Sequence, residues 1–118
     1  MTIRPLFAAL AVLALAGCAA DPAPNEQLRL TEQALEQAAA VGAATEDVPE
    51  LKLAESKFAQ AQADMTHQSF KDARIQAEQA ELDARLAEAK VLTLKSQEKL
   101  NVLNTRITRL RKQLGDAQ

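Results

Sequence analysis

Apolar residues recur every three or four positions from about residue 26 to the end of the chain, which is the period of a helix with one buried face. The pattern is interrupted after Gly42 and again at residues 66–69. It therefore predicts an all-α fold with helices at about 26–41, 48–66 and 70–112. We expect an antiparallel helical hairpin or a three-helix bundle with a long C-terminal helix, which can also form a coiled coil.

Local signals mark the expected ends of these helices. Asn25 and Ser69 are suitable N-cap residues, and Asp47 with Glu50 has the spacing of a capping box. Gly42 is expected to end the first helix because glycine adopts the left-handed conformation that a helix C-terminus often needs.

The third predicted helix carries two stripes on roughly opposite faces. The first is rich in alanine and contains Phe70, Ala73, Ala77, Ala80, Ala84, Ala87, Val91 and Leu94. The second contains Ile75, Leu82, Leu86 and Ala89, and continues through Thr93 and Ser96 to Leu100, Leu103, Ile107, Leu110 and Leu114. Two stripes predict two different packing partners.

An antiparallel hairpin folded about residue 67 places large residues of the second helix opposite alanines of the third. The expected pairs include Val48 with Ala87 and Leu51 with Ala84. Such pairs allow a close approach while filling the interface.

The third helix is longer than the second and overhangs it from about Val91. The stripe from Leu100 to Leu114 therefore needs a separate partner. We expect the first helix to cover it; the alternative is a second copy of the chain in a coiled coil.

Composition excludes several classes of protein. The chain has 118 residues with one Cys, one His, three Gly and neither Trp nor Tyr. It is poor in the β-branched and aromatic residues that form sheets. It lacks a second cysteine for an internal disulfide and the glycines of a phosphate-binding loop. His67 falls in a predicted turn, so we expect no catalytic residues, no metal site, no cofactor and no enzyme activity.

The first residues predict export rather than fold. Arg4 precedes an uncharged apolar run at 6–16, which is too short to cross a bilayer and is typical of a signal peptide at residues 1–17. The segment Leu15-Ala16-Gly17-Cys18 resembles the lipobox of bacterial lipoproteins. The resemblance implies cleavage before Cys18 and a covalent lipid on Cys18, with diacylglycerol on its sulfur and an acyl chain such as palmitate on its amine.

The lipobox resemblance also implies a destination. Ala19 and Ala20 follow the cysteine where an aspartate retains lipoproteins in the inner membrane, so we expect an outer-membrane anchor on the periplasmic face. Residues 18–24 then form the lipidated cysteine and a Pro-rich tether, and residues 25–118 form the helical domain.

Acidic and basic residues are unevenly distributed along the chain. Residues 21–66 hold nine acidic and three basic residues, net −6, whereas residues 67–118 hold seven acidic and ten basic residues, net +3. Five bases without an acid lie near the end, namely Lys99, Arg106, Arg109, Arg111 and Lys112. They either complement the helix dipole on a solvated face or contact an anionic surface such as peptidoglycan or an acidic envelope protein; nucleic acid is not expected.

Two segments carry a family resemblance: Asp47-Val-Pro-Glu-Leu-Lys-Leu-Ala-Glu55 and Phe70-Lys-Asp-Ala-Arg74. With the lipobox, they resemble the small bacterial envelope lipoproteins that carry domain of unknown function 4398. Members of that family occur alone or ahead of an OmpA-like peptidoglycan-binding domain, and we expect no such second domain here. The family implies a helical hairpin but no biochemical activity.

The sequence therefore predicts a non-catalytic lipoprotein with a structural or adaptor role in the cell envelope. Two alternatives stay open: a homo-oligomeric coiled-coil spacer, and a helical module that binds a partner between its helices.

Overall fold

The computed structural model describes residues 21–116, of which 83% are helical with no strand. The helices are α2 (Asn25–Ala40), α3 (Pro49–Thr66) and α4 (Phe70–Gly115). Their ends lie within three residues of the positions that the apolar pattern predicts. The described part is about 73 Å long, and the predicted all-α class with a long C-terminal helix is confirmed.

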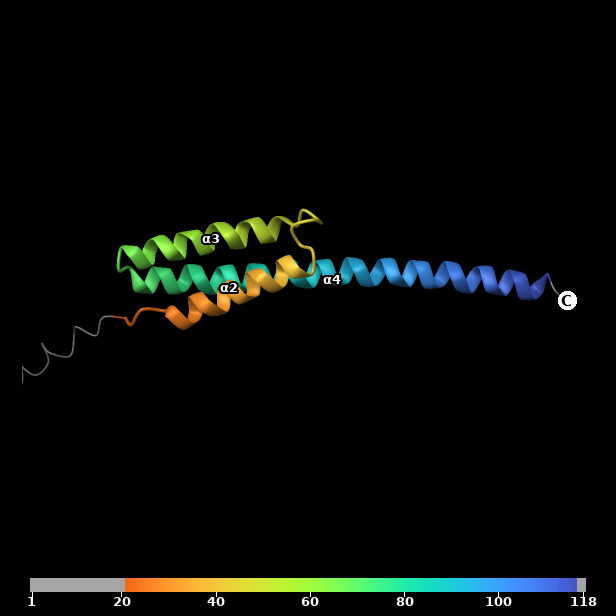
Figure 1. Ribbon diagram of the computed structural model, residues 1–118, viewed down its shortest axis with the longest axis horizontal. Coiled ribbons are helices and arrows are strands. Elements are labelled where there is room, and N and C mark those ends of the chain that lie inside the picture. The colour runs from red at the N-terminus through yellow and green to blue at the C-terminus, as the bar shows by residue number, and fades with distance from the viewer. Residues whose placement is uncertain (1–20, 117–118) are drawn as a thin grey trace, which may run out of the picture.

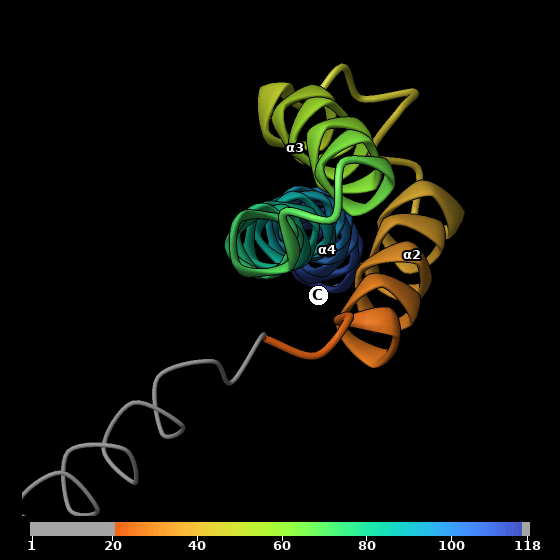
Figure 2. The same ribbon diagram turned by 90° about the vertical axis from the view of Figure 1, so that its left-hand side faces the viewer.

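The three helices form an up-down-up bundle around the N-terminal half of α4 (Figure 1). Helix α2 runs parallel to α4, since Thr31 contacts Ala77 near its start and Val41 contacts Lys95 at its end. Helix α3 runs antiparallel to both. Viewed end-on, α2 and α3 lie together on one side of α4 and leave its other side open (Figure 2).

Alanine dominates the interior of the bundle. Helix α4 buries five alanines and one valine along one face: Ala73, Ala77, Ala80, Ala84, Ala87 and Val91. Val48, the N-cap of α3, and Leu51 of α3 share a buried cluster with Ala87 and Val91 of α4. Ala38 of α2 and Ala43 of the following loop also belong to it. Small side chains let helix axes approach closely, so the alanine stripe is the packing face of α4.

Val48 and Ala87 share a buried cluster, as predicted, whereas Leu51 is displaced from its predicted partner by about one turn of α4. Leu51 shares a buried cluster with Ala87 rather than with the predicted Ala84, whereas Ala84 lies with Ala54 and Ala34. The prediction assumed a symmetric hairpin folded about residue 67. The turn between Thr66 and Phe70 is centred on residue 68, which accounts for about two residues of this displacement.

Gly42 ends α2 as predicted, with φ of +95°. Its N–H donates to Ala39 O, and the next N–H, of Ala43, donates to Ala38 O, which is the Schellman arrangement. The α3–α4 turn has the same two hydrogen bonds, from Gln68 to Met65 O and from Ser69 to Asp64 O. There the left-handed position is held by Gln68, with φ of 60°.

The predicted side-chain caps are not made. Pro24, Val48 and Ser69 are the N-cap residues, and none makes a side-chain capping bond. Pro49 explains the failure of the Asp47 capping box: proline keeps the preceding residue extended and takes the first helical position, so Val48 becomes the cap. Asp47 lies one residue outside the helix, and its carboxylate accepts a hydrogen bond from Lys52 Nζ at 2.6 Å.

Candidate interaction surface on the long helix

The last 20 of the 46 residues of α4 extend beyond the bundle without cover from the described residues. Val91 is its last buried residue, and the final contact with the bundle joins Lys95 Nζ to Val41 O at 2.6 Å. We call residues 96–115 the arm, which extends past the other two helices in Figure 1. Every residue of the arm is exposed.

The prediction that the first helix covers the end of α4 is wrong. Helix α2 packs Thr31, Ala34 and Ala38 against the alanine face of the bundle, far from Leu100. The loop at 41–48 must also connect α2 to the start of α3, which lies beside Val91. Helix α2 is thereby held alongside residues 74–95 and cannot reach the arm.

Five large apolar residues form a line along the arm. We call them the apolar stripe: Leu100, Leu103, Ile107, Leu110 and Leu114, which are between 45% and 71% exposed. Their spacing alternates between three and four residues, so they share one face of the helix. An exposed apolar line of this length is typical of an interaction surface.

The five predicted basic residues all lie on the arm and are exposed: Lys99, Arg106, Arg109, Arg111 and Lys112. None forms an ion pair with a carboxylate of residues 21–116. Lys112 lies in the last helical turn, where a cation complements the helix dipole. The other four extend along the arm, so the dipole alone does not explain their positions.

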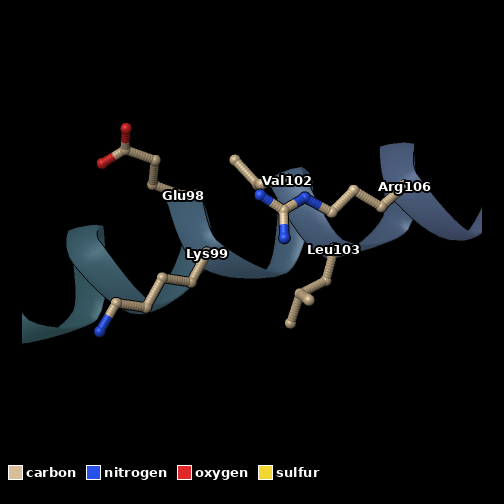
Figure 3. Close-up of a pocket in the computed structure, with 5 residues that line it drawn as sticks. All are labelled: Glu98, Lys99, Val102, Leu103 and Arg106. Atoms are coloured by element: carbon tan, nitrogen blue, oxygen red, sulfur yellow. The ribbon is translucent and has the colours of Figure 1, made fainter.

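A shallow hollow on the arm is lined by Glu98, Lys99, Val102, Leu103 and Arg106. All five side chains come from one helix and point away from its axis in different directions (Figure 3). The hollow is therefore an open surface on one helix and not an enclosed pocket of the kind that holds a small substrate.

The remaining sequence-predicted site residues are not brought together. Cys18 and the lipobox residues Leu15, Ala16 and Gly17 lie outside the described residues. His67 is exposed at the end of α3. Within residues 21–116, no cluster of three or more His, Cys, Asp or Glu side chains could hold a metal ion. None of the described helices combines the length and apolar character needed to span a membrane.

Sequence reasoning missed the polar contacts that place α2 on α4. Thr31 is fully buried, and its Oγ1 lies 2.8 Å from Gln27 O and 2.9 Å from Ala77 O, so the hydroxyl proton has an acceptor on each helix. Gln27 Nε2 donates to Glu81 Oε2 at 2.7 Å. The sequence did contain a signal for this contact. Thr31, Ala34 and Ala38 are spaced by three and four residues, so these small side chains share one face of α2.

Carboxylates on the bundle surface are held by donors from neighbouring helices. The hydrogen bond from Gln27, followed by that from Arg85, lowers the pKa of Glu81. Lys90 of α4 lowers the pKa of Glu50 on α3 through a hydrogen-bonded ion pair. Lys57 and Asp83 form a second α3–α4 pair at 2.7 Å. These contacts belong to the bundle and do not extend to the arm.

The geometry defines a class: an elongated three-helix bundle whose longest helix ends in an exposed apolar and basic arm. The model of the family "Domain of unknown function (DUF4398)" matches residues 26–103, so the chain belongs to the DUF4398 family. The crystal structure of a DUF4398 family protein from Pseudomonas aeruginosa PAO1 is similar, with a TM-score of 0.78 and 66% sequence identity. The similarity covers 82% of this chain and 100% of that one. A search of curated proteins found no match.

Proposed function

We propose that this protein is a lipid-anchored, non-catalytic structural or adaptor protein of the outer membrane, whose arm is its contact surface. The observation that carries the proposal is the placement of the tether and the arm at opposite ends of one rigid rod. The anchor itself rests on the lipobox resemblance at residues 15–18.

Residues 21–24, the described part of the predicted tether, lie at the end of the bundle where α4 begins. Pro22 O accepts a hydrogen bond from Arg74 Nη2 at 3.3 Å, close to the start of α4 at Phe70. From Arg74 to Gly115 the same helix rises about 60 Å at 1.5 Å per residue. A lipid on Cys18 would hold one end of the rod, and the arm would present its surface at the other.

The chemistry of the arm favours a macromolecular partner. Leucine and isoleucine supply apolar area, and five cations at exposed positions supply long-range attraction to an anionic surface. The shallow, open hollow at Val102 and Leu103 does not exclude water as a catalytic site would.

Metabolic labelling tests the anchor. The full-length chain, expressed in a Gram-negative host, should incorporate labelled palmitate and fractionate with the outer membrane. The Cys18→Ser variant should incorporate none, because the acyl groups require that thiol. An unlabelled wild-type chain would remove the anchor from the proposal.

In-cell photocrosslinking tests the arm. A photoreactive residue at Arg109 should give a discrete adduct whose mass spectrum identifies the partner. The same residue at Gln60, which is exposed on α3, is the matched control and should give a weaker adduct. Equal adducts from both positions would contradict a specific contact through the arm.

A further inference from the structure

The apolar stripe of the arm continues onto the open face of the bundle, and we propose that a second copy of this chain docks there in antiparallel orientation. Counted from Leu82, the continuous line steps alternately by four and three residues. Its members are Leu82, Leu86, Ala89, Thr93, Ser96, Leu100, Leu103, Ile107, Leu110 and Leu114.

The line is long enough for a coiled coil. It spans 82–114, nearly five heptads and about 50 Å of helix, which exceeds the three to four heptads that usually specify one. It is also accessible at its bundle end, where Leu82 is 67% exposed and Leu86 is 46% exposed. Helices α2 and α3 lie on the other side of α4 and leave this face free for a partner (Figure 2).

Packing selects the antiparallel orientation. The line has a thin stretch of small residues, Ala89, Thr93 and Ser96, followed by a stretch of large ones. In a parallel pair in register, each of these three small residues packs against the same small residue of the other copy, which leaves three poorly filled layers. An antiparallel pair with its two-fold axis near Glu98 fills every layer, as follows: Leu82 with Leu114, Leu86 with Leu110, Ala89 with Ile107, Thr93 with Leu103, and Ser96 with Leu100.

The hydroxyl of Thr93 is compatible with that interface. Its Oγ1 already donates to Ala89 O at 2.8 Å, so the proton is satisfied within the helix. Burial beneath Leu103 of a second copy therefore leaves no donor without an acceptor.

Charge selects the same orientation. Residues 21–95 contain fourteen acidic and eight basic residues, net −6, whereas the arm contains five bases and Glu98, net +4. Antiparallel docking separates the two cationic arms, because each arm then lies along residues 82–96 of the other copy. Parallel docking places the two arms together and brings Arg106 beside Arg111 of the second copy, which like-charge repulsion disfavours.

Docking of a second copy uses the arm and so rests on the arm being the contact surface proposed above. It does not require the acyl anchor, and a chain that fails palmitate labelling can still dimerise. In a dimer with both anchors, the tethers lie at opposite ends, so a pair held in one membrane lies along its surface.

Thiol crosslinking in intact cells distinguishes the orientations. Gln97 lies beside the two-fold axis and Gln113 lies about 45 Å from its counterpart in the antiparallel pair, although both are exposed glutamines outside the apolar line. With a short bifunctional thiol reagent, full-length Gln97→Cys should yield about tenfold more dimer than Gln113→Cys, because only the first pair is within reach. The chain with Cys18 alone gives the background.

Each other result overturns the proposal. Equal yields from the two positions indicate a parallel pair, and yields at background indicate a monomer or a different partner for the stripe. A heterologous adduct from Gln97→Cys in place of the dimer assigns the stripe to another protein.

Sedimentation of the detergent-solubilised full chain supplies a second test with matched residues. Leu103 and Leu94 are both 51% exposed on α4, but only Leu103 belongs to the apolar line. Leu103→Asn should raise the dimer dissociation constant about tenfold or more, since it buries an unpartnered amide in two layers. Leu94→Asn should leave the constant within about twofold, because that side chain points away from the interface. Equal losses, or a wild-type chain that is monomeric throughout, would contradict the docking.

Discussion

The two parts of α4 differ in how they meet their surroundings. Residues 70–95 lie against two helices of the same chain and present alanine to them, whereas the arm meets no helix of the described chain and presents leucine. Alanine on the packing face allows α2 and α3 to approach closely, and leucine on the arm leaves apolar area exposed. One helix therefore has a face that two helices of the same chain cover and a face that no described residue covers.

Polar groups show the same difference. In the bundle, Thr31 is placed between a carbonyl of its own helix and one of α4. On the arm, Thr105 makes only the local bond to Asn101 O at 2.9 Å. The two side chains are identical, but only Thr31 has a carbonyl of a second helix within hydrogen-bond distance, so only Thr31 joins two helices.

Overpacking the alanine face should give the largest loss of stability. Ala77 is fully buried between α4 and α2, so Ala77→Leu should reduce the free energy of unfolding by about 1–3 kcal/mol. Ala59 is exposed on α3, and Ala59→Leu should change it by less than about 0.5 kcal/mol. Chemical denaturation monitored by circular dichroism measures both. An unchanged midpoint for Ala77→Leu would show that the interface is looser than the structure indicates.

The two threonines make a direct test of the comparison. Thr31→Val should destabilise the bundle by about 1 kcal/mol, because it removes the hydroxyl that joins α2 to Ala77 of α4. Thr105→Val should be close to neutral, since its local bond competes with water. Thermal melting of both variants gives the difference. Equal effects would mean that the buried hydroxyl adds nothing beyond its local bond.

Replacing the residue with left-handed backbone in the α3–α4 turn by glycine should remove backbone strain and stabilise the bundle slightly. Gln68 has φ of 60°, which is unfavourable for a residue with a Cβ atom, so Gln68→Gly should gain about 0.5 kcal/mol after the added chain entropy is subtracted. His67 has an ordinary φ of −86°, and His67→Gly should instead destabilise. Denaturation midpoints that move in the same direction would contradict the turn geometry.

The smallest effect concerns pH and is confined to the bundle. The pKa of Glu81 is lowered from its ordinary value of 4.5 by Gln27 and then Arg85, so the folded state holds this proton less tightly than the unfolded state. Its contribution is complete above about pH 4.5 and is lost as the pH falls through the lower folded pKa. The melting temperature of Glu81→Gln should therefore fall less steeply than that of wild type on acidification below pH 4.5.

Glu98→Gln is the control on the arm, because Glu98 contacts no other helix. At neutral pH its melting temperature should equal that of wild type. A steeper acid loss for Glu81→Gln than for wild type would reverse the sign of the predicted linkage.

Helix positions and the alanine face could be predicted because both depend on local periodicity. The turns after Ala40 and Thr66, and the buried run from Ala73 to Val91, follow directly from the spacing of apolar residues. All five basic residues of the arm were likewise placed on the exposed end of α4.

The register, the caps and the position of α2 could not be predicted from periodicity. Register depends on the backbone of the turn at Gln68, and a shift of one turn keeps every alanine on the same face. Pro49 displaced the cap from Asp47 to Val48. A line of leucines at three-and-four spacing fits a helix of the same chain as well as a helix of another, so the cover of the arm could not be assigned from spacing alone.

The parallel course of α2 and α4 has a mechanical consequence. A pull applied between the Asp21 end and the arm would draw α2 and α4 in opposite directions along their common axis. Contacts from Gln27 to Val41 would then bear the load together, as in shear, rather than yielding one after another as in peeling. We therefore expect the bundle to resist a pull along its length better than a pull that separates the helices from one end.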